Sequence, residues 1–213
     1  MNRLVVFDLD GTLIDSAGDL AQAMNATLAR LAPGTPPLPL TTVRRFIGNG
    51  AGVLVARSLQ AVGLEVRPED ALPVFLDCYR SRLLDTTRLY PGVSETLDQL
   101  AGRTLAVLSN KPGDMSRTIL QGLGVAGRFA RIWGAGDVPA RKPDPAGLQR
   151  LMAELDASAT ETVLVGDSAV DIQTGRAAGV RTVGVSYGLD PESLQHAAPD
   201  VVVDDARDLA RVL

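Results

Sequence analysis

Two pairs of aspartates in this sequence have a spacing that could build one acidic site. Asp8 and Asp10 lie two residues apart and precede Gly11, and side chains at i and i+2 of an extended segment point to the same side. Asp167 and Asp171 lie four residues apart, which places both on one face of a helix near its start. Each pair has a plain structural alternative, because Asp and Gly are common in turns and Asp commonly caps a helix. Neither pair alone establishes a site.

A bound metal ion would explain the two pairs together. Both follow short apolar runs that resemble strands, and open α/β sheets bind ligands at the carboxyl ends of their strands. If the two strand ends meet, as many as four carboxylates crowd one site, and each close pair of like charges costs about 4 kcal/mol at an effective dielectric near 20. An all-oxygen ligand set without neighbouring His or Cys favours a hard cation, and Mg²⁺, which shares phosphate oxygens, suits it. The sequence therefore predicts a magnesium site.

The two lysines of the chain are an independent clue. They are Lys111 and Lys142, and the other basic residues among the 21 Lys and Arg are all arginine. A position that keeps lysine in such a chain suggests a need for a compact point charge. Lys142 stands in a proline-rich turn, whereas Lys111 follows Ser109 and Asn110, whose polar groups could cradle phosphate oxygens. The alternatives are a plain turn and solvated surface lysines, the latter more plausible for Lys111 than for Lys142.

Alternating strands and helices are expected to position these residues. Short apolar runs with the pattern of strands buried on both faces occupy residues 4–7, 104–108, 162–165, 182–185 and 200–203, with 131–133 as a further candidate. Segments with apolar residues at helical spacing separate them, as in residues 148–155. This alternation predicts an α/β fold with a Rossmann-like parallel sheet as the core of three layers.

The alternation breaks between Ser16 and about Tyr90. No strand pattern is evident there, and several amphipathic helical stretches follow Ser16, which opens the first of them. The segment Tyr90-Pro91-Gly92 has the composition of a hinge that returns the chain to the sheet. We therefore expect a catalytic core formed by residues 1–15 and 91–213, and an inserted all-helical cap domain formed by residues 16–90.

Composition argues against several classes of partner. The formal net charge is -4 and the basic residues are scattered, so we expect neither nucleic acid nor a membrane surface as a partner. Cys78, the single cysteine, fits a small buried hydrophobe in a reducing compartment. The first apolar run ends at Asp8, too early for a signal peptide, and we expect a cytoplasmic protein. The oligomeric state stays open between monomer and homodimer.

These motifs, in this order, resemble those of the haloacid dehalogenase superfamily of phosphohydrolases. The matching segments are Asp8-Leu9-Asp10-Gly11-Thr12, Ser109-Asn110, Lys142-Pro143, and Gly166-Asp167-Ser168 with Asp171. The helical insertion matches the small cap of the family in its position. Within the superfamily the chain is similar to bacterial phosphoglycolate phosphatases through residues 13–20 and 46–51. The resemblance covers essentially the whole chain.

The resemblance implies a role for each motif residue. Asp8 would be the nucleophile and a metal ligand. Asp10 would be the general acid and base, and would offer its backbone carbonyl to Mg²⁺. Asp167 would complete the protein ligands of the metal. Lys142 would neutralise Asp8 and phosphate together, and Asp171 would position Lys142 or a water on the metal.

The same resemblance implies how the substrate is held. Ser109 and the backbone of Asn110 would bind the transferring phosphoryl group, together with the lysine of the third motif. In the cap, the backbone around Asn49 and Gly50 could face an anion, and Arg45 could pair with a carboxylate. A solvated helix face explains Arg45 equally well.

The expected activity is that of a magnesium-dependent phosphatase acting on a small phosphorylated metabolite, first of all 2-phosphoglycolate, through an aspartyl-phosphate. Asp10 argues against dehalogenation, because dehalogenases of the superfamily lack this acid. The lack of Lys and His between residues 16 and 90 argues against the related phosphonatases and sugar-phosphate mutases, which use such cap residues. A nucleotide, sugar-phosphate or pyrophosphate phosphatase of the same fold is the nearest alternative. A non-catalytic regulator that binds a phosphorylated ligand is the alternative of another class.

Overall fold

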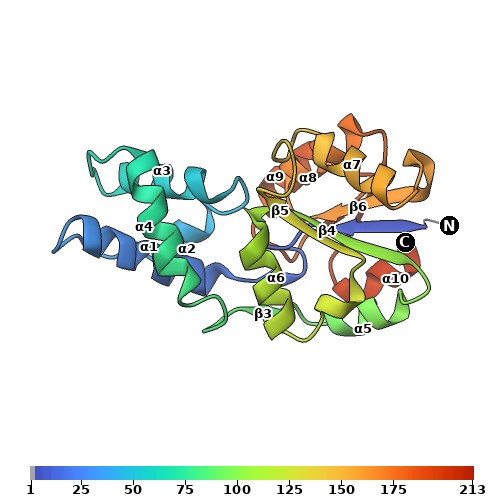
Figure 1. Ribbon diagram of the computed structural model, residues 1–213, viewed down its shortest axis with the longest axis horizontal. Coiled ribbons are helices and arrows are strands. Elements are labelled where there is room, and N and C mark those ends of the chain that lie inside the picture. Colours follow the sequence, from blue (N-terminus) through green and yellow to red (C-terminus); the bar gives the residue numbers. More distant parts are fainter. Residues whose placement is uncertain (1–2) are drawn as a thin grey trace.

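A six-stranded parallel sheet forms the centre of the molecule (Figure 1). The computed structural model describes residues 3–213, and the strands lie in the order β5-β4-β1-β6-β7-β8. Their bounds are Leu4–Phe7 for β1, Thr104–Pro112 for β4, Arg131–Ala135 for β5, Thr162–Gly166 for β6, Arg181–Val185 for β7 and Val201–Val203 for β8. All six strands expected from the apolar runs are confirmed.

Helices cover both faces of this sheet and complete the three layers. On one face lie α7 (Ala146–Glu154), α8 (Ala169–Ala177) and α9 (Pro191–Ala197), and on the other lie α5 (Val93–Gln99), α6 (Gly113–Gly122) and α10 (Leu209–Val212) (Figure 1). Alternate residues of β1 serve the two faces, because Leu4 and Val6 pack with the apolar cluster of α7 whereas Val5 and Phe7 belong to the larger core opposite. Burial on both sides explains why β1 is an uninterrupted apolar run.

The register of β1 brings the sequence motifs to one edge of the sheet. Phe7 is aligned with Val107 of β4 and with Val165 of β6. The residues that continue past these positions are Asp8, Ser109 and the segment from Gly166, and they lie together at the carboxyl ends of three adjacent parallel strands. Ligands bind at this edge in open α/β sheets.

Four helices form a separate lobe beyond this edge (Figure 1). They are α1 (Ala17–Leu31), α2 (Leu40–Arg44), α3 (Ala51–Ala61) and α4 (Pro68–Arg80). Buried apolar residues such as Met24, Leu59 and Phe75 hold the lobe together, and Cys78 is buried among them as expected. Within residues 3–213, no helix is both long enough and apolar enough to cross a membrane.

A short two-stranded sheet joins the helical lobe to the core, and the sequence did not predict it. Strand β2 (Ile14–Asp15) pairs in antiparallel fashion with β3 (Arg88–Leu89), which lies in the segment where we expected no strand. Each strand has two residues, too few to show a period in the sequence. The chain therefore enters and leaves the lobe through two paired segments.

Asp19 locks these two connections together from the first turn of α1. Its buried carboxylate accepts hydrogen bonds from the backbone N–H and hydroxyl groups of Thr86, at 2.8 and 2.5 Å, and of Thr87, at 2.9 and 2.7 Å. Gly18 permits the close approach, because a Cβ at this position would collide with Thr86. Burial alone would raise the pKa of Asp19, but the four hydrogen bonds outweigh it and the pKa lies below its ordinary value.

We expect Asp19→Asn to lower the free energy of unfolding by about 3 kcal/mol at pH 7, because the amide places a donor where hydrogen-bond donors already point. A carboxyl with a lowered pKa stabilises the fold above its unfolded pKa, here 3.8, and loses this contribution as the pH falls through the folded value. Urea denaturation should therefore show the two proteins converging below pH 3.8. Asp77→Asn, at an exposed carboxylate of α4, should have a far smaller effect, and an equal loss in this control would contradict the locking role of Asp19.

Candidate active site

Three aspartates meet where β1 ends between β4 and β6. Asp8 directly follows β1, and its backbone N–H donates to the carbonyl oxygen of Val165 at 2.9 Å. Asp167 follows β6, and Asp171 lies in the first turn of α8. One carboxylate oxygen of each aspartate lies within 4.8 Å of the other two, and all three side chains are buried. We expected the two acidic pairs to lie close together, and three of their four aspartates do. The carboxylate of the fourth, Asp10, binds other residues.

Lys142 supplies the positive charge of this cluster. Its Nζ donates to Asp171 Oδ1 at 2.6 Å and lies 2.8 Å from Asp8 Oδ1. Asn110 fixes the lysine backbone, because its amide donates to the Lys142 carbonyl at 3.0 Å and accepts from the Lys142 N–H at 2.9 Å. The Ser168 hydroxyl holds the other oxygen of Asp171 at 2.7 Å. A solvated surface position, one of the two alternatives for Lys142, is therefore wrong.

Negative charge exceeds positive charge in the cluster. Burial raises the pKa of Asp8 to about 6, although the ammonium of Lys142 opposes the shift. Burial also raises the pKa of Asp167 well above its ordinary value, and the carboxylates of Asp171 and Asp8 add to this effect. Asp8 Oδ1 receives no hydrogen bond of good geometry from the described residues. Three carboxylates thus share one ammonium in a buried place.

The cluster has the composition of a site for a divalent cation. Its donors are all carboxylate oxygens, which hard cations prefer. The excess negative charge, which the single ammonium of Lys142 leaves, is relieved by such an ion. Gly11 and Gly188 enclose Asp167, and a Cβ at either position would overlap its carboxylate. The glycine of the first motif is therefore needed for the close packing of Asp167.

Asp10 is held by a second buried lysine. The Nζ of Lys111 donates to both carboxylate oxygens of Asp10, at 2.8 and 2.9 Å, and the Ser16 hydroxyl donates to Oδ1 at 2.5 Å. Burial would lower the pKa of Lys111, but the charge of Asp10 outweighs it and the pKa lies above its ordinary value. The ammonium also lies 4.6 Å from the ring centre of Tyr79 in α4. The alternative of a solvated surface lysine is therefore wrong for Lys111 as well.

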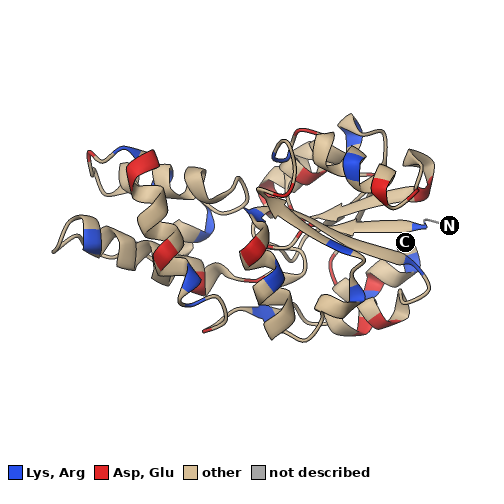
Figure 2. Ribbon diagram, in the orientation of Figure 1, with Lys and Arg blue, Asp and Glu red and all other residues tan. Residues whose placement is uncertain are grey.

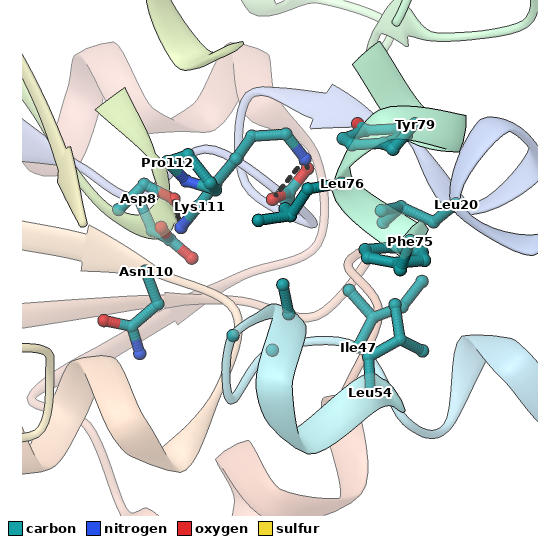
Figure 3. A pocket seen from close by; sticks show the side chains of 15 residues that line it. Asp8, Leu20, Ile47, Leu54, Phe75, Leu76, Tyr79, Asn110, Lys111 and Pro112 are labelled. Carbon is teal, nitrogen blue, oxygen red and sulfur yellow. Dashed lines mark hydrogen bonds and ion pairs between the residues drawn. The ribbon is translucent and has the colours of Figure 1, made fainter. Parts of the chain in front are cut away.

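A cavity that is partly open to solvent lies between the edge of the sheet and the helical lobe (Figure 3). Its fifteen lining residues are Asp8, Asp10, Ser109, Asn110, Lys111 and Pro112 on the core side, and Leu20, Ile47, Gly48, Gly50, Ala51, Leu54, Phe75, Leu76 and Tyr79 on the lobe side. The core side is polar, whereas the lobe side is mostly apolar.

Of the three cap residues predicted to contact the substrate, the structure places one at the cavity. Gly50 lines the cavity, but neither Asn49 nor Arg45 is among its lining residues, and Arg45 is exposed. Ser109, a predicted phosphate-binding residue, lines the cavity and is 4% exposed. Reasoning from the sequence missed Tyr79, whose position in an amphipathic helix gave no sign that it would reach the site.

Charged residues elsewhere are arranged differently. Figure 2 shows basic and acidic residues interspersed over both parts of the molecule. Arginine forms surface pairs such as Arg30 with Asp77 and Arg80 with Asp114, in which every side chain is more than half exposed. The side chains of both lysines, by contrast, are 3% exposed. Both lysines of this arginine-rich chain thus carry buried charges, whereas these arginines lie at the surface.

Comparison with known proteins places this site in a family. The family model described as haloacid dehalogenase-like hydrolase matches residues 5–185. The phosphoglycolate phosphatase of Pseudomonas putida is 40% identical over 216 residues, which cover 97% of this chain and 78% of that protein. The phosphoglycolate phosphatase of Pectobacterium atrosepticum is 41% identical over 214 residues, which cover 97% of this chain and 90% of that protein.

A solved structure agrees with these relatives. The crystal structure of a predicted phosphoglycolate phosphatase from Haemophilus somnus superposes with a TM-score of 0.92 at 32% identity, and the match covers 99% of this chain and 97% of that one. The family match spans both the acidic cluster and the helical lobe. The chain therefore belongs to the haloacid dehalogenase-like hydrolase family, in which it is a phosphoric monoester hydrolase.

Proposed function

We propose that this protein is a magnesium-dependent phosphatase that hydrolyses 2-phosphoglycolate through an aspartyl-phosphate on Asp8. The observation that carries the proposal is the buried contact of Asp8 with Lys142, at 2.8 Å, beside the polar side of the cavity that Asp8 lines. The relatives with 40% and 41% identity are phosphoglycolate phosphatases, which supports the choice of substrate.

In the first half-reaction, a carboxylate oxygen of Asp8 forms a bond to phosphorus as the bond from phosphorus to the leaving oxygen breaks. Lys142 and Ser109 face the phosphoryl oxygens and stabilise their charge, because both are buried and fixed beforehand. Asp10 gives its proton to the leaving oxygen, which departs as an alcohol.

In the second half-reaction, Asp10 acts as a base. It takes a proton from a water molecule whose oxygen attacks phosphorus, and the bond between phosphorus and Asp8 breaks. Inorganic phosphate leaves and the Asp8 carboxylate is restored. Asp171 takes no part in bond making, but it keeps the Lys142 ammonium against Asp8.

Asp8, Asp167 and the backbone carbonyl of Asp10 would hold the magnesium ion. Bound there, Mg²⁺ supplies positive charge to the phosphoryl oxygens and offsets the repulsion among the carboxylates. In the structure the nearest candidates for additional ligation are the oxygens of Asp171, but Lys142 and Ser168 already occupy them.

We further propose that residues 1–15 and 91–213 act as the catalytic core and residues 16–90 as a cap. The cap residues Ile47, Leu54 and Phe75 cover the catalytic groups with an apolar wall. Such a wall excludes bulk water from the phosphorylated enzyme. The paired strands β2 and β3 are the only covalent connections between the two parts within the described chain, and they form the hinge of the cap.

We expect Asp8→Asn to lower kcat by about four orders of magnitude or more, because the amide is not a nucleophile and removes a metal ligand charge. Steady-state phosphate release with 2-phosphoglycolate and Mg²⁺ measures the change, and circular dichroism verifies the fold. Asp77→Asn, the same substitution at an exposed carboxylate, serves as the control. Near-normal activity of Asp8→Asn would overturn the mechanism. A wild-type protein that binds phosphorylated ligands without releasing phosphate would instead favour the non-catalytic regulator.

Metal binding should be visible in thermal stability. Asp167→Asn should raise the melting temperature without metal, because burial and two nearby carboxylates disfavour the charge of Asp167, and an amide oxygen still accepts from the Leu189 N–H. Added MgCl₂ should raise the melting temperature of the wild type, since a ligand of the folded state stabilises it. The variant should respond far less. An equal rise in melting temperature with Mg²⁺ in both proteins would mean that Asp167 does not bind the ion.

A substrate panel tests the organic part of the proposal. With Mg²⁺ present, kcat/KM for 2-phosphoglycolate should exceed the values for ribose 5-phosphate, nucleoside monophosphates and pyrophosphate by about tenfold or more, because a site that pairs a substrate charge rejects analogues without it. The apolar cap side of the cavity also disfavours a polar sugar. Faster turnover of a nucleotide, a sugar phosphate or pyrophosphate would assign the protein to that alternative.

A further inference from the structure

The proposed substrate carries a carboxylate besides its phosphate, and the cavity wall offers one basic side chain to meet it. Among the fifteen lining residues, all within the described part of the chain, Lys111 alone is basic. Its ammonium has three N–H donors, of which two meet the oxygens of Asp10 at 2.8 and 2.9 Å. The third donor is not taken by a carboxylate and lies beside Tyr79, on the wall of the cavity.

A second polar group lies beside this ammonium. Tyr79 is 1% exposed and lines the cavity, and its hydroxyl has no hydrogen bond of good geometry within residues 3–213. The neighbouring Lys111 ammonium can only donate to this hydroxyl, so the hydroxyl proton has no acceptor. Figure 3 shows the hydroxyl end of Tyr79 turned toward the ammonium of Lys111. Buried hydroxyls are normally paired, so an unpaired one in a cavity wall indicates a place for a ligand acceptor. The stacking of its ring on Phe75 holds the group in place.

We propose that Lys111 and Tyr79 together bind the carboxylate of the leaving group and so select acidic alcohols as products. One carboxylate oxygen pairs with the ammonium of Lys111, and the Tyr79 hydroxyl donates to the same carboxylate. This inference rests on the proposed phosphatase function and deepens it. It assigns the substrate carboxylate to the junction of core and cap rather than to an arginine.

The dimensions of glycolate fit this arrangement. A single methylene separates its carboxylate from the oxygen that leaves phosphorus. Because Lys111 also holds Asp10, a carboxylate on the same ammonium brings the leaving oxygen close to the carboxyl group that must protonate it. Lys111 thereby contacts both the substrate and its acid.

The arginines of the cap have other positions. Arg45 is exposed and outside the cavity wall. Arg44 donates to the carbonyl oxygen of Gly188 at 3.2 Å and lies 3.9 Å from Asp15, both outside the cavity wall. The rest of the cap wall is apolar, and an unpaired carboxylate against it would lose its hydration without compensation.

Two substrates that differ in one group test the inference. They are 2-phosphoglycolate and 2-hydroxyethyl phosphate, which replaces the carboxylate by a neutral alcohol. Lys111→Met should lower kcat/KM for 2-phosphoglycolate about 100-fold more than for 2-hydroxyethyl phosphate. The loss of its contact with Asp10 affects both substrates, whereas only 2-phosphoglycolate also loses a charged partner of its carboxylate. Tyr79→Phe, which keeps the packed ring, should give a selective loss of about tenfold. Arg57→Met, the same loss of charge on an exposed face of α3, should leave both values unchanged.

Each other result overturns the inference. Equal losses on both substrates in Lys111→Met would mean that Lys111 serves only to hold Asp10. Unchanged kcat/KM values in Lys111→Met would show that Lys111 does not contribute to the site. If Lys111→Met does not fold, Tyr79→Phe decides, and an unselective or absent effect in that variant rejects the carboxylate site.

Failure of the substrate assignment is distinguishable from failure of this inference. Wild-type protein that prefers 2-hydroxyethyl phosphate refutes 2-phosphoglycolate as the substrate, whatever the variants do. Inhibition of 2-hydroxyethyl phosphate turnover by glycolate then tests the carboxylate site by itself. Inhibition that is about tenfold weaker or more in Lys111→Met supports the site, and equal inhibition in both proteins rejects it.

Discussion

The buried ion pair of Lys142 with Asp8 and Asp171 is the interaction on which the rest of the site depends. The parallel register of β1 with its two neighbours brings three carboxylates to one edge, where their mutual repulsion opposes folding. Lys142 offsets part of this repulsion, and Asn110 holds the lysine backbone with two hydrogen bonds. The remaining negative charge is what makes the place attractive to a divalent cation and, through that cation, to a phosphate group.

The sheet and most of the site could be predicted because their signals are local. An apolar run such as Leu4–Phe7 is buried on both faces and ends abruptly at Asp8, so strand and site residue are adjacent in the sequence. Asp167 follows its strand in the same way. Parallel strands then place these ends side by side without further information. Composition also singled out Lys142 as a position that needs a compact point charge, and the structure places this lysine in a buried ion pair.

Contacts between core and cap could not be predicted, because they join segments far apart in the sequence. Lys111 has the neighbours of a surface turn, and its burial depends on Asp10 and on the docking of Tyr79 from α4. The pair β2 and β3 is too short to leave a periodic pattern, and Asp19 resembles an ordinary first-turn acid although it binds Thr86 and Thr87. Arg45 shows the opposite failure, since its residue type suits a carboxylate but its position is exposed.

Asp10 takes part both in contacts within the core and in contacts between core and cap. Its carboxylate is held from the core by Lys111 and from the first residue of the cap by Ser16, so its orientation depends on the position of both parts. The Lys111 ammonium faces Tyr79 across the cavity, which links the same carboxylate to a third element. Donors from two parts of the molecule hold this carboxylate. It therefore has its full set of hydrogen bonds only when cap and core are packed together. The proposed acid, Asp10, is therefore organised by cap and core together, whereas the proposed nucleophile, Asp8, is organised by the core alone.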